Sequence, residues 1–219
     1  MLLETKGTYM RAAKGGIADE SQQTCRDLLD SIQSTPKGSI FDDDDGSIFE
    51  KACDNLQGKN KERVISDISR LLVPSAETLA LYNKNKHLAI LTESTNEGWN
   101  NSIPLTEICP QPDYSVGFQV EAFTADQLTR LSLFLGEYLD GDLSFFMATY
   151  YMLFPFLTCE VQCGAGALDV ADRQNAHSMT LAARAVVELF RLVEREDDVH
   201  RQILAFSVSH DSCGVRLYG

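Results

Sequence analysis

The sequence predicts an α/β (α+β) fold in which a mixed central β-sheet is flanked by helices. Residues 114–120 alternate in polarity like a strand, and residues 152–161 form a nearly continuous apolar run that is typical of a strand buried on both faces. Residues 203–209 and 215–218 are predicted as two closing strands joined by a tight turn. Helical patterns separate these segments. An order of strand, helix, strand, long helix and two strands implies a mixed sheet with helices packed against it.

Residues 1–58 are predicted to form a polar, partly helical N-terminal extension. One helical pattern places four apolar residues on one face: Cys25, Leu28, Leu29 and Ile32. A second, shorter pattern spans residues 48–56. The acidic run at 42–45 lacks the alternating oxygen ligands and the closing Glu of a calcium-binding loop, so a solvated loop is predicted there.

The core domain is placed at residues 59–219. Its first element is an amphipathic helix over residues 64–72 that ends before Pro74. Ser75 is predicted to cap a second short helix, and Thr124 a third one. The apolar face of that third helix is expected to comprise Leu128, Leu131, Leu135 and Leu139.

A long helix is expected after the glycines at 164 and 166. Its buried face is predicted to contain Ala176, Met179, Ala183, Val186, Val187, Phe190 and Val193.

The composition narrows the cellular setting of the chain. The 219 residues carry 19 Lys and Arg against 32 Asp and Glu, a net charge of −13. Such a charge argues against non-specific coating of nucleic acids and against attraction to anionic membranes. The apolar stretch at 145–159 is too short to span a bilayer, and no secretory signal is visible at the N-terminus. The six cysteines are therefore interpreted as reduced thiols of a cytoplasmic or nuclear protein.

Two acidic residues adjoin the predicted strands. Asp113 follows Pro112 and opens the first of them, whereas Glu160 lies near the end of the apolar run. Carboxylates on neighbouring strands suit Mg²⁺, which prefers oxygen ligands and retains several waters. Such an ion can polarise a phosphodiester and lower the pKa of a bound water.

Four segments carry a family resemblance: PSAETL, QPDYSVGF, FPFLTCEVQCGAGALDVADRQNAHS and ILAFSVSHD. Because of these segments, the chain from about residue 60 to 219 resembles the PD-(D/E)xK nuclease superfamily. More narrowly, it resembles an uncharacterised family of fungal nuclease-like proteins. The resemblance implies a restriction-endonuclease-like core and Mg²⁺-dependent phosphodiester hydrolysis of nucleic acid.

The resemblance also assigns roles to individual residues. It implies that Asp113 and Glu160 hold the metal, that Glu62 is the acidic residue of the first core helix, and that Gln174 lies on the helix after the motif. Gln162 stands where the superfamily usually has lysine; a glutamine can orient water but carries no charge. Because no lysine follows Lys86, no other lysine is expected to take this place.

The distribution of charge along the sequence indicates which partners the chain is expected to bind. Residues 104–172 contain ten acidic residues and one basic residue, Arg130, so their net charge of −9 repels a nucleic-acid backbone. The predicted substrate-binding residues are therefore cations elsewhere: Lys59, Lys61, Arg63 and Arg173. Weak nucleic-acid binding is expected. The alternative is a catalytically inactive protein with this fold that acts as an interaction or effector module for a protein partner.

Overall fold

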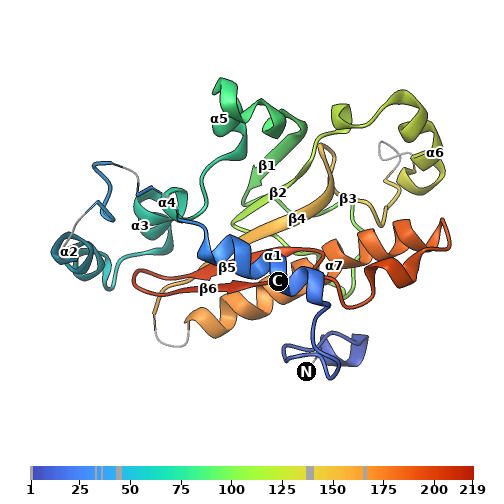
Figure 1. Cartoon of the computed structure of the whole chain (residues 1–219). Helices are drawn as coiled ribbons and strands as arrows, with labels where there is room; N and C mark the ends of the chain where they lie inside the picture. The colour runs from blue at the N-terminus through green and yellow to red at the C-terminus, as the bar shows by residue number, and fades with distance from the viewer. Residues whose placement is uncertain (1, 33, 36, 43–45, 137–140, 165–166) are drawn as a thin grey trace.

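The computed structural model describes the chain except for residues 1, 33, 36, 43–45, 137–140 and 165–166 (Figure 1). Its described strands form one mixed sheet in the order β1-β2-β4-β5-β6, with β3 beside β4. Only β4 and β5 among these described pairs run parallel. The bounds are β1 (Leu91–Thr95), β2 (Tyr114–Phe118), β3 (Met147–Thr149), β4 (Met152–Val161), β5 (Phe206–His210) and β6 (Val215–Tyr218). The sheet and its flanking helices confirm the predicted fold class.

The helices are α1 (Asp19–Asp30), α2 (Ser47–Leu56), α3 (Lys61–Val64), α4 (Arg70–Leu72), α5 (Ala76–Ala80), α6 (Ala125–Leu135) and α7 (Ala167–Arg191). A π-helical turn, Ile65–Ser69, joins α3 to α4. The predicted caps are confirmed: the Ser75 hydroxyl accepts a hydrogen bond from the Thr78 N–H at 3.0 Å, and Thr124 forms a capping box at the start of α6. Leu139 and most of the acidic run at 42–45 lie outside the described residues.

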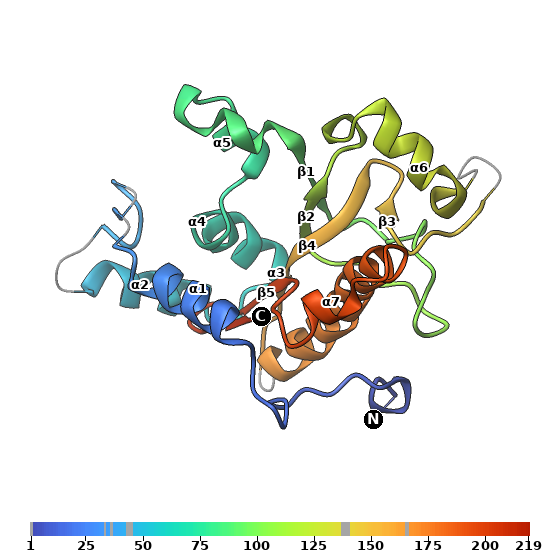
Figure 2. The same ribbon diagram turned by 45° about the vertical axis from the view of Figure 1, so that its right-hand side comes forward.

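Helices cover both faces of the sheet (Figures 1 and 2). Helix α7 connects the parallel strands β4 and β5 and packs against both of them. On the opposite face, Val64 and Val73 pack against Tyr114, Cys159 and Val161 of β2 and β4. Strand β4 therefore lies in the core, as its apolar sequence predicts. No helix in the described ranges is both long enough and apolar enough to cross a membrane.

The predicted buried face of α7 is wrong. Among the described side chains of this helix, the buried ones are Ala171, Asp172, Asn175, Ser178, Leu181, Ala182 and Ala185. Asn175 bridges three sheet groups: it accepts from the Thr158 hydroxyl at 2.6 Å and donates to the Val208 carbonyl and the Ser209 hydroxyl, both at 2.9 Å. Small and hydrogen-bonded side chains allow α7 to approach the sheet closely, so the larger apolar residues lie at its sides.

An irregularity in the β2–β4 ladder requires a glycine. The register shifts between Val116 and Phe118, where β4 contains Pro155, which has no N–H for the ladder. A Cβ at Gly117 would lie 2.9 Å from the Leu153 carbonyl oxygen and 3.0 Å from the Pro155 Cα. Gly117 thus permits the two backbones to approach at the bulge.

The N-terminal extension is attached to the core through the segment before β5. Arg201 donates to the carbonyls of Gly16 and Ile17 at 2.8 and 3.1 Å, and the Ile203 N–H donates to the Ser21 hydroxyl at 3.0 Å. In α2, Cys53 and Leu56 are buried. The boundary at residue 58 remains a prediction.

Candidate active site

Asp113, which directly precedes β2, lies opposite Glu160 of the adjacent strand β4. In the antiparallel β2–β4 ladder, Tyr114 pairs with Cys159, so the residue before Tyr114 faces the residue after Cys159. Both side chains are buried, with 8% of Asp113 and 2% of Glu160 exposed. The predicted pairing of these carboxylates by the two strands is therefore present in the structure.

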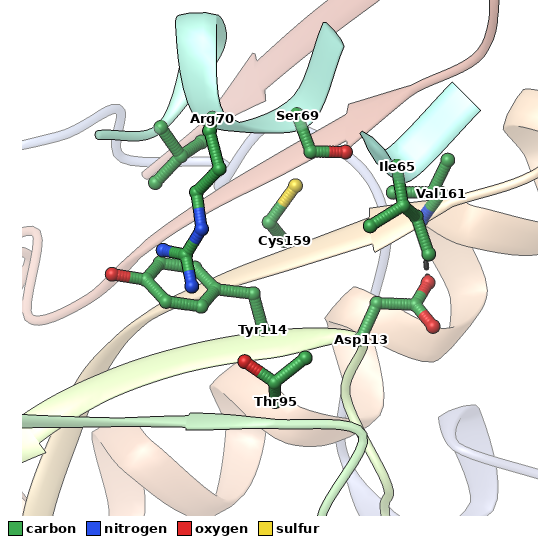
Figure 3. Close-up of a pocket in the computed structure, with 9 residues that line it drawn as sticks. Ile65, Ser69, Arg70, Thr95, Asp113, Tyr114, Cys159 and Val161 are labelled. Carbon is green, nitrogen blue, oxygen red and sulfur yellow. Dashed lines mark hydrogen bonds between the residues drawn. The ribbon is translucent and has the colours of Figure 1, made fainter. Parts of the chain in front are cut away.

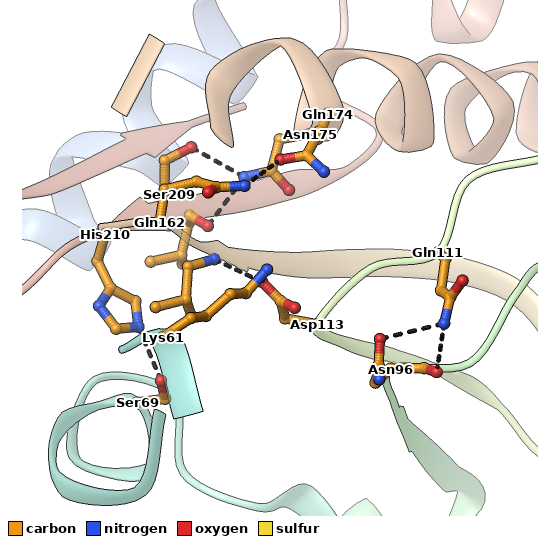
Figure 4. Close-up of polar contacts among 12 residues, drawn as sticks. Lys61, Ser69, Asn96, Gln111, Asp113, Gln162, Gln174, Asn175, Ser209 and His210 are labelled. Atoms are coloured by element: carbon orange, nitrogen blue, oxygen red, sulfur yellow. Dashed lines mark hydrogen bonds and ion pairs between the residues drawn. The ribbon is translucent and has the colours of Figure 1, made fainter. Parts of the chain in front are cut away.

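A lysine also reaches this pair. The Lys61 ammonium, from the first turn of α3, lies 2.7 Å from Asp113 Oδ2 (Figure 4). The expectation that no lysine would enter the site was wrong, because it considered only the chain after Lys86. Lys61 had been assigned to the substrate surface instead. The Val161 N–H donates to the same Asp113 oxygen at 2.7 Å, which fixes the carboxylate (Figure 3).

Glu160 is the electrostatically unusual member of the pair. Burial, first, and then the negative charge of Asp113 and a hydrogen bond between the carboxyls raise the pKa of Glu160 to about 8, against the opposing influence of Lys61. Its Oε2 atom is buried and has no hydrogen-bond partner among the described residues. A buried carboxylate oxygen without a donor is unfavourable unless a proton or a cation reaches it.

The two glutamines of the predicted site lie together. Gln162 follows the end of β4, and its Nε2 donates to Gln174 Oε1 on α7 at 2.8 Å. Gln162 is half-buried, whereas Gln174 is exposed. This hydrogen bond joins the end of β4 to the start of α7 (Figure 4).

The remaining predicted site residues lie on the surface of the molecule. Glu62 is exposed in the first turn of α3, and no hydrogen bond or ion pair joins it to Asp113 among the described residues. Arg63 forms an ion pair with Asp67 at 2.9 Å, while Lys59 and Arg173 are exposed. Lys61, and not its neighbour Glu62, is thus the α3 side chain that meets Asp113.

Sequence reasoning also missed a partly buried Ser–His contact near Asp113. Ser69 Oγ lies 2.9 Å from His210 Nε2, and His210 is fully buried, which lowers its pKa. Ser69 lines a cavity of about 30 Å³ together with Cys159 and Asp113 (Figure 3). Such a volume holds about one or two waters. Burial is the largest of the causes that raise the pKa of the Cys159 thiol to about 12, so the thiol stays protonated.

A family model described as "Domain of unknown function (DUF7924)" matches residues 48–219. The chain belongs to this family. The DUF7924 region includes α2 from its second residue onward, the whole described sheet and every residue of the candidate site. No curated protein and no solved structure matches the chain.

The carboxylate pair of this DUF7924 chain fits Mg²⁺ by the chemistry of its oxygens. The unpartnered Glu160 Oε2 and the buried Asp113 carboxylate are oxygen donors of the kind that a hard cation prefers. Within the described ranges, no group of three or more His, Cys, Asp and Glu side chains is arranged to hold a metal. Mg²⁺ commonly uses one or two protein carboxylates and completes its shell with water and substrate phosphate.

Proposed function

We propose that the chain is a nuclease that hydrolyses nucleic-acid phosphodiesters with Mg²⁺. One observation carries the proposal: a buried carboxyl with an unsatisfied oxygen, Glu160, lies beside a second carboxylate that is joined to a lysine ammonium. Two acidic groups and one cation at the end of a central sheet are what a metal-assisted phosphoryl transfer needs. The sequence resemblance supports the same conclusion.

Asp113 and Glu160 would hold the ion, which when bound polarises the phosphate and lowers the pKa of a water. The Val161 N–H and the Lys61 ammonium keep the Asp113 carboxylate in place. Lys61 brings the positive charge that Gln162 lacks, and this charge stabilises a phosphate that becomes more negative in the transition state. The Nε2 group of Gln162 donates to Gln174. The Oε1 atom of Gln162 therefore remains to accept a hydrogen bond from water.

A second candidate function is a catalytically inactive interaction or effector module that binds a protein through its acidic surface. It is favoured by the number of contacts that Asp113 Oδ2 already makes, since both Lys61 and Val161 donate to this oxygen. We also propose a cytoplasmic or nuclear setting, which the six free thiols support.

The deciding experiment measures cleavage of single-stranded and duplex DNA and RNA, with Mg²⁺ in excess over the protein, by the wild type, Glu160→Gln and Glu62→Gln. We expect cleavage by the wild type and by Glu62→Gln, because the Glu62 carboxyl is exposed. Glu160→Gln should lose it. If folded wild type neither cuts nor binds Mg²⁺, the interaction module is the better explanation.

A further inference from the structure

Two thiols from distant parts of the sequence meet where the N-terminal helices contact the sheet. Cys53 lies on α2, and Cys213 lies in the turn between β5 and β6. In Figures 1 and 2 this turn extends toward α2. A hydrogen bond joins the two side chains, and both are free thiols in this structure.

Cys53 is the protected member of the pair. It is buried on the inward side of α2 together with Leu56, which follows three residues later on the same helix face. Burial, first, and then the hydrogen bond to Cys213 raise the pKa of Cys53 to about 11. Cys53 therefore stays a protonated thiol at neutral pH, and a buried thiol of this kind is not the first to react with a dissolved oxidant.

Cys213 is the accessible member of the pair. Its side chain is exposed, so an oxidant in solution reaches it directly. The turn around it is held by the Asp211 carboxylate, which accepts hydrogen bonds from the N–H groups of Cys213 and Gly214 at 2.8 and 2.7 Å. The backbone that carries the exposed thiol is thus kept in the position that brings it to Cys53.

Cys163 has similar surroundings but no thiol neighbour. It is also exposed and follows the end of β4, the strand that runs parallel to β5. Burial and the charge of Asp211 raise the pKa of Cys163 while Lys61 lowers it, and no thiol is among these influences in the described part of the chain. Cys163 is therefore a matched control for Cys213.

We propose that Cys53 and Cys213 form a reversible disulfide when the protein meets a hydroperoxide, and that this bond fastens α2 to the β5–β6 turn. The Cys213 thiolate attacks one peroxide oxygen, the O–O bond breaks, and hydroxide leaves while Cys213 becomes a sulfenic acid. The Cys53 sulfur then attacks the sulfenic sulfur, the S–S bond forms, and the S–O bond breaks with loss of water.

The reaction balances without a further reactant. Two thiols are oxidised to one disulfide, and one molecule of hydrogen peroxide is reduced to two of water. A dithiol reductant restores both thiols by thiol–disulfide exchange. Because the bond closes a loop that contains most of the chain, it should stabilise the fold strongly.

The test treats the full reduced chain with an equimolar amount of hydrogen peroxide, blocks the remaining thiols and maps the peptides without reduction. We expect a linked pair of peptides that contain Cys53 and Cys213, and a loss of two of the six free thiols. Cys163→Ser should give the same linked pair. Cys53→Ser should stop at a sulfenic acid on Cys213, which dimedone traps.

Urea denaturation measures whether the bond fastens α2. Oxidation should raise the urea midpoint of the wild type and of Cys163→Ser, and dithiothreitol should reverse the rise. Cys213→Ser changes only an exposed side chain, so it should fold like the reduced wild type and show no rise on oxidation. A link from Cys213 to Cys163, or a sulfenic acid that persists on Cys213 in the folded wild type, would overturn the proposal. Equal midpoints for the cross-linked and reduced wild type would refute the fastening of α2.

Discussion

Replacement of Glu160 by Gln should change how stability depends on pH. The pKa of this carboxyl is about 8 in the folded chain against an ordinary value of 4.5. Between these values the folded state holds a proton that the unfolded state releases, so the free energy of unfolding must fall as pH rises from about 4.5 to 8. At about 1.4 kcal/mol per pH unit, the loss by pH 7 is roughly 3 kcal/mol. This is a large part of the 5–15 kcal/mol or so that stabilises a typical domain.

The assay is urea denaturation at half-unit steps from pH 5 to pH 9 in EDTA. The wild type should lose stability over this range, and Glu160→Gln should lose about 3 kcal/mol less between pH 5 and pH 7.5 because its amide does not titrate. Glu62→Gln is the control, with an exposed carboxyl on α3 and an expected slope equal to that of the wild type. Parallel pH curves for wild type and Glu160→Gln would refute the burial argument. Added Mg²⁺ should stabilise the wild type most above pH 8, where the metal no longer competes with the proton on Glu160.

Three further predictions follow from single contacts. Lys61→Met should reduce Mg²⁺-dependent cleavage at least about 100-fold, because it removes the cation beside Asp113. Lys61→Arg should retain more activity, since the cation is kept. Equal cleavage rates for the Met and Arg variants would contradict the role of the charge. Asn175→Ala should lower the free energy of unfolding by about 2–4 kcal/mol, measured in urea, since three hydrogen bonds to the sheet are lost. Gly117→Ala should cost about 1–3 kcal/mol in the same assay, because its Cβ would meet the β4 backbone; an unchanged midpoint would show that the bulge relaxes.

Local sequence patterns were sufficient for most secondary structure. The apolar run of β4 corresponds to residues 152–161, and the caps at Ser75 and Thr124 begin helices as predicted. These features depend on neighbouring residues alone: a buried strand needs apolar residues on both faces, and a cap needs one side-chain oxygen beside a free N–H.

The carboxylate pair was predictable, but its lysine was not recognised. Asp113 and Glu160 were found because each adjoins a predicted strand. A signal for Lys61 was present, because it lies three and four residues before Val64 and Ile65 and so shares the inward face of that helix, which Glu62 does not. Periodicity shows that Lys61 points inward. Only the packing of α3 against the ends of β2 and β4 decides that its ammonium meets Asp113.

The orientation of α7 shows most clearly what hydrophobic periodicity in the sequence fails to predict. Hydrophobicity selected the face with Met179 and Phe190, yet the helix buries Asn175 and Ser178 against the sheet. The free energy of a buried polar group depends on whether partners are present, and the partners of Asn175 lie 17 to 34 residues away on β4 and β5. Residue types alone specified most of the helices and strands, although β1 and β3 were not among the predicted strands. Which polar groups are buried together, and therefore where the chemistry lies, was decided by contacts that form only when the chain is folded.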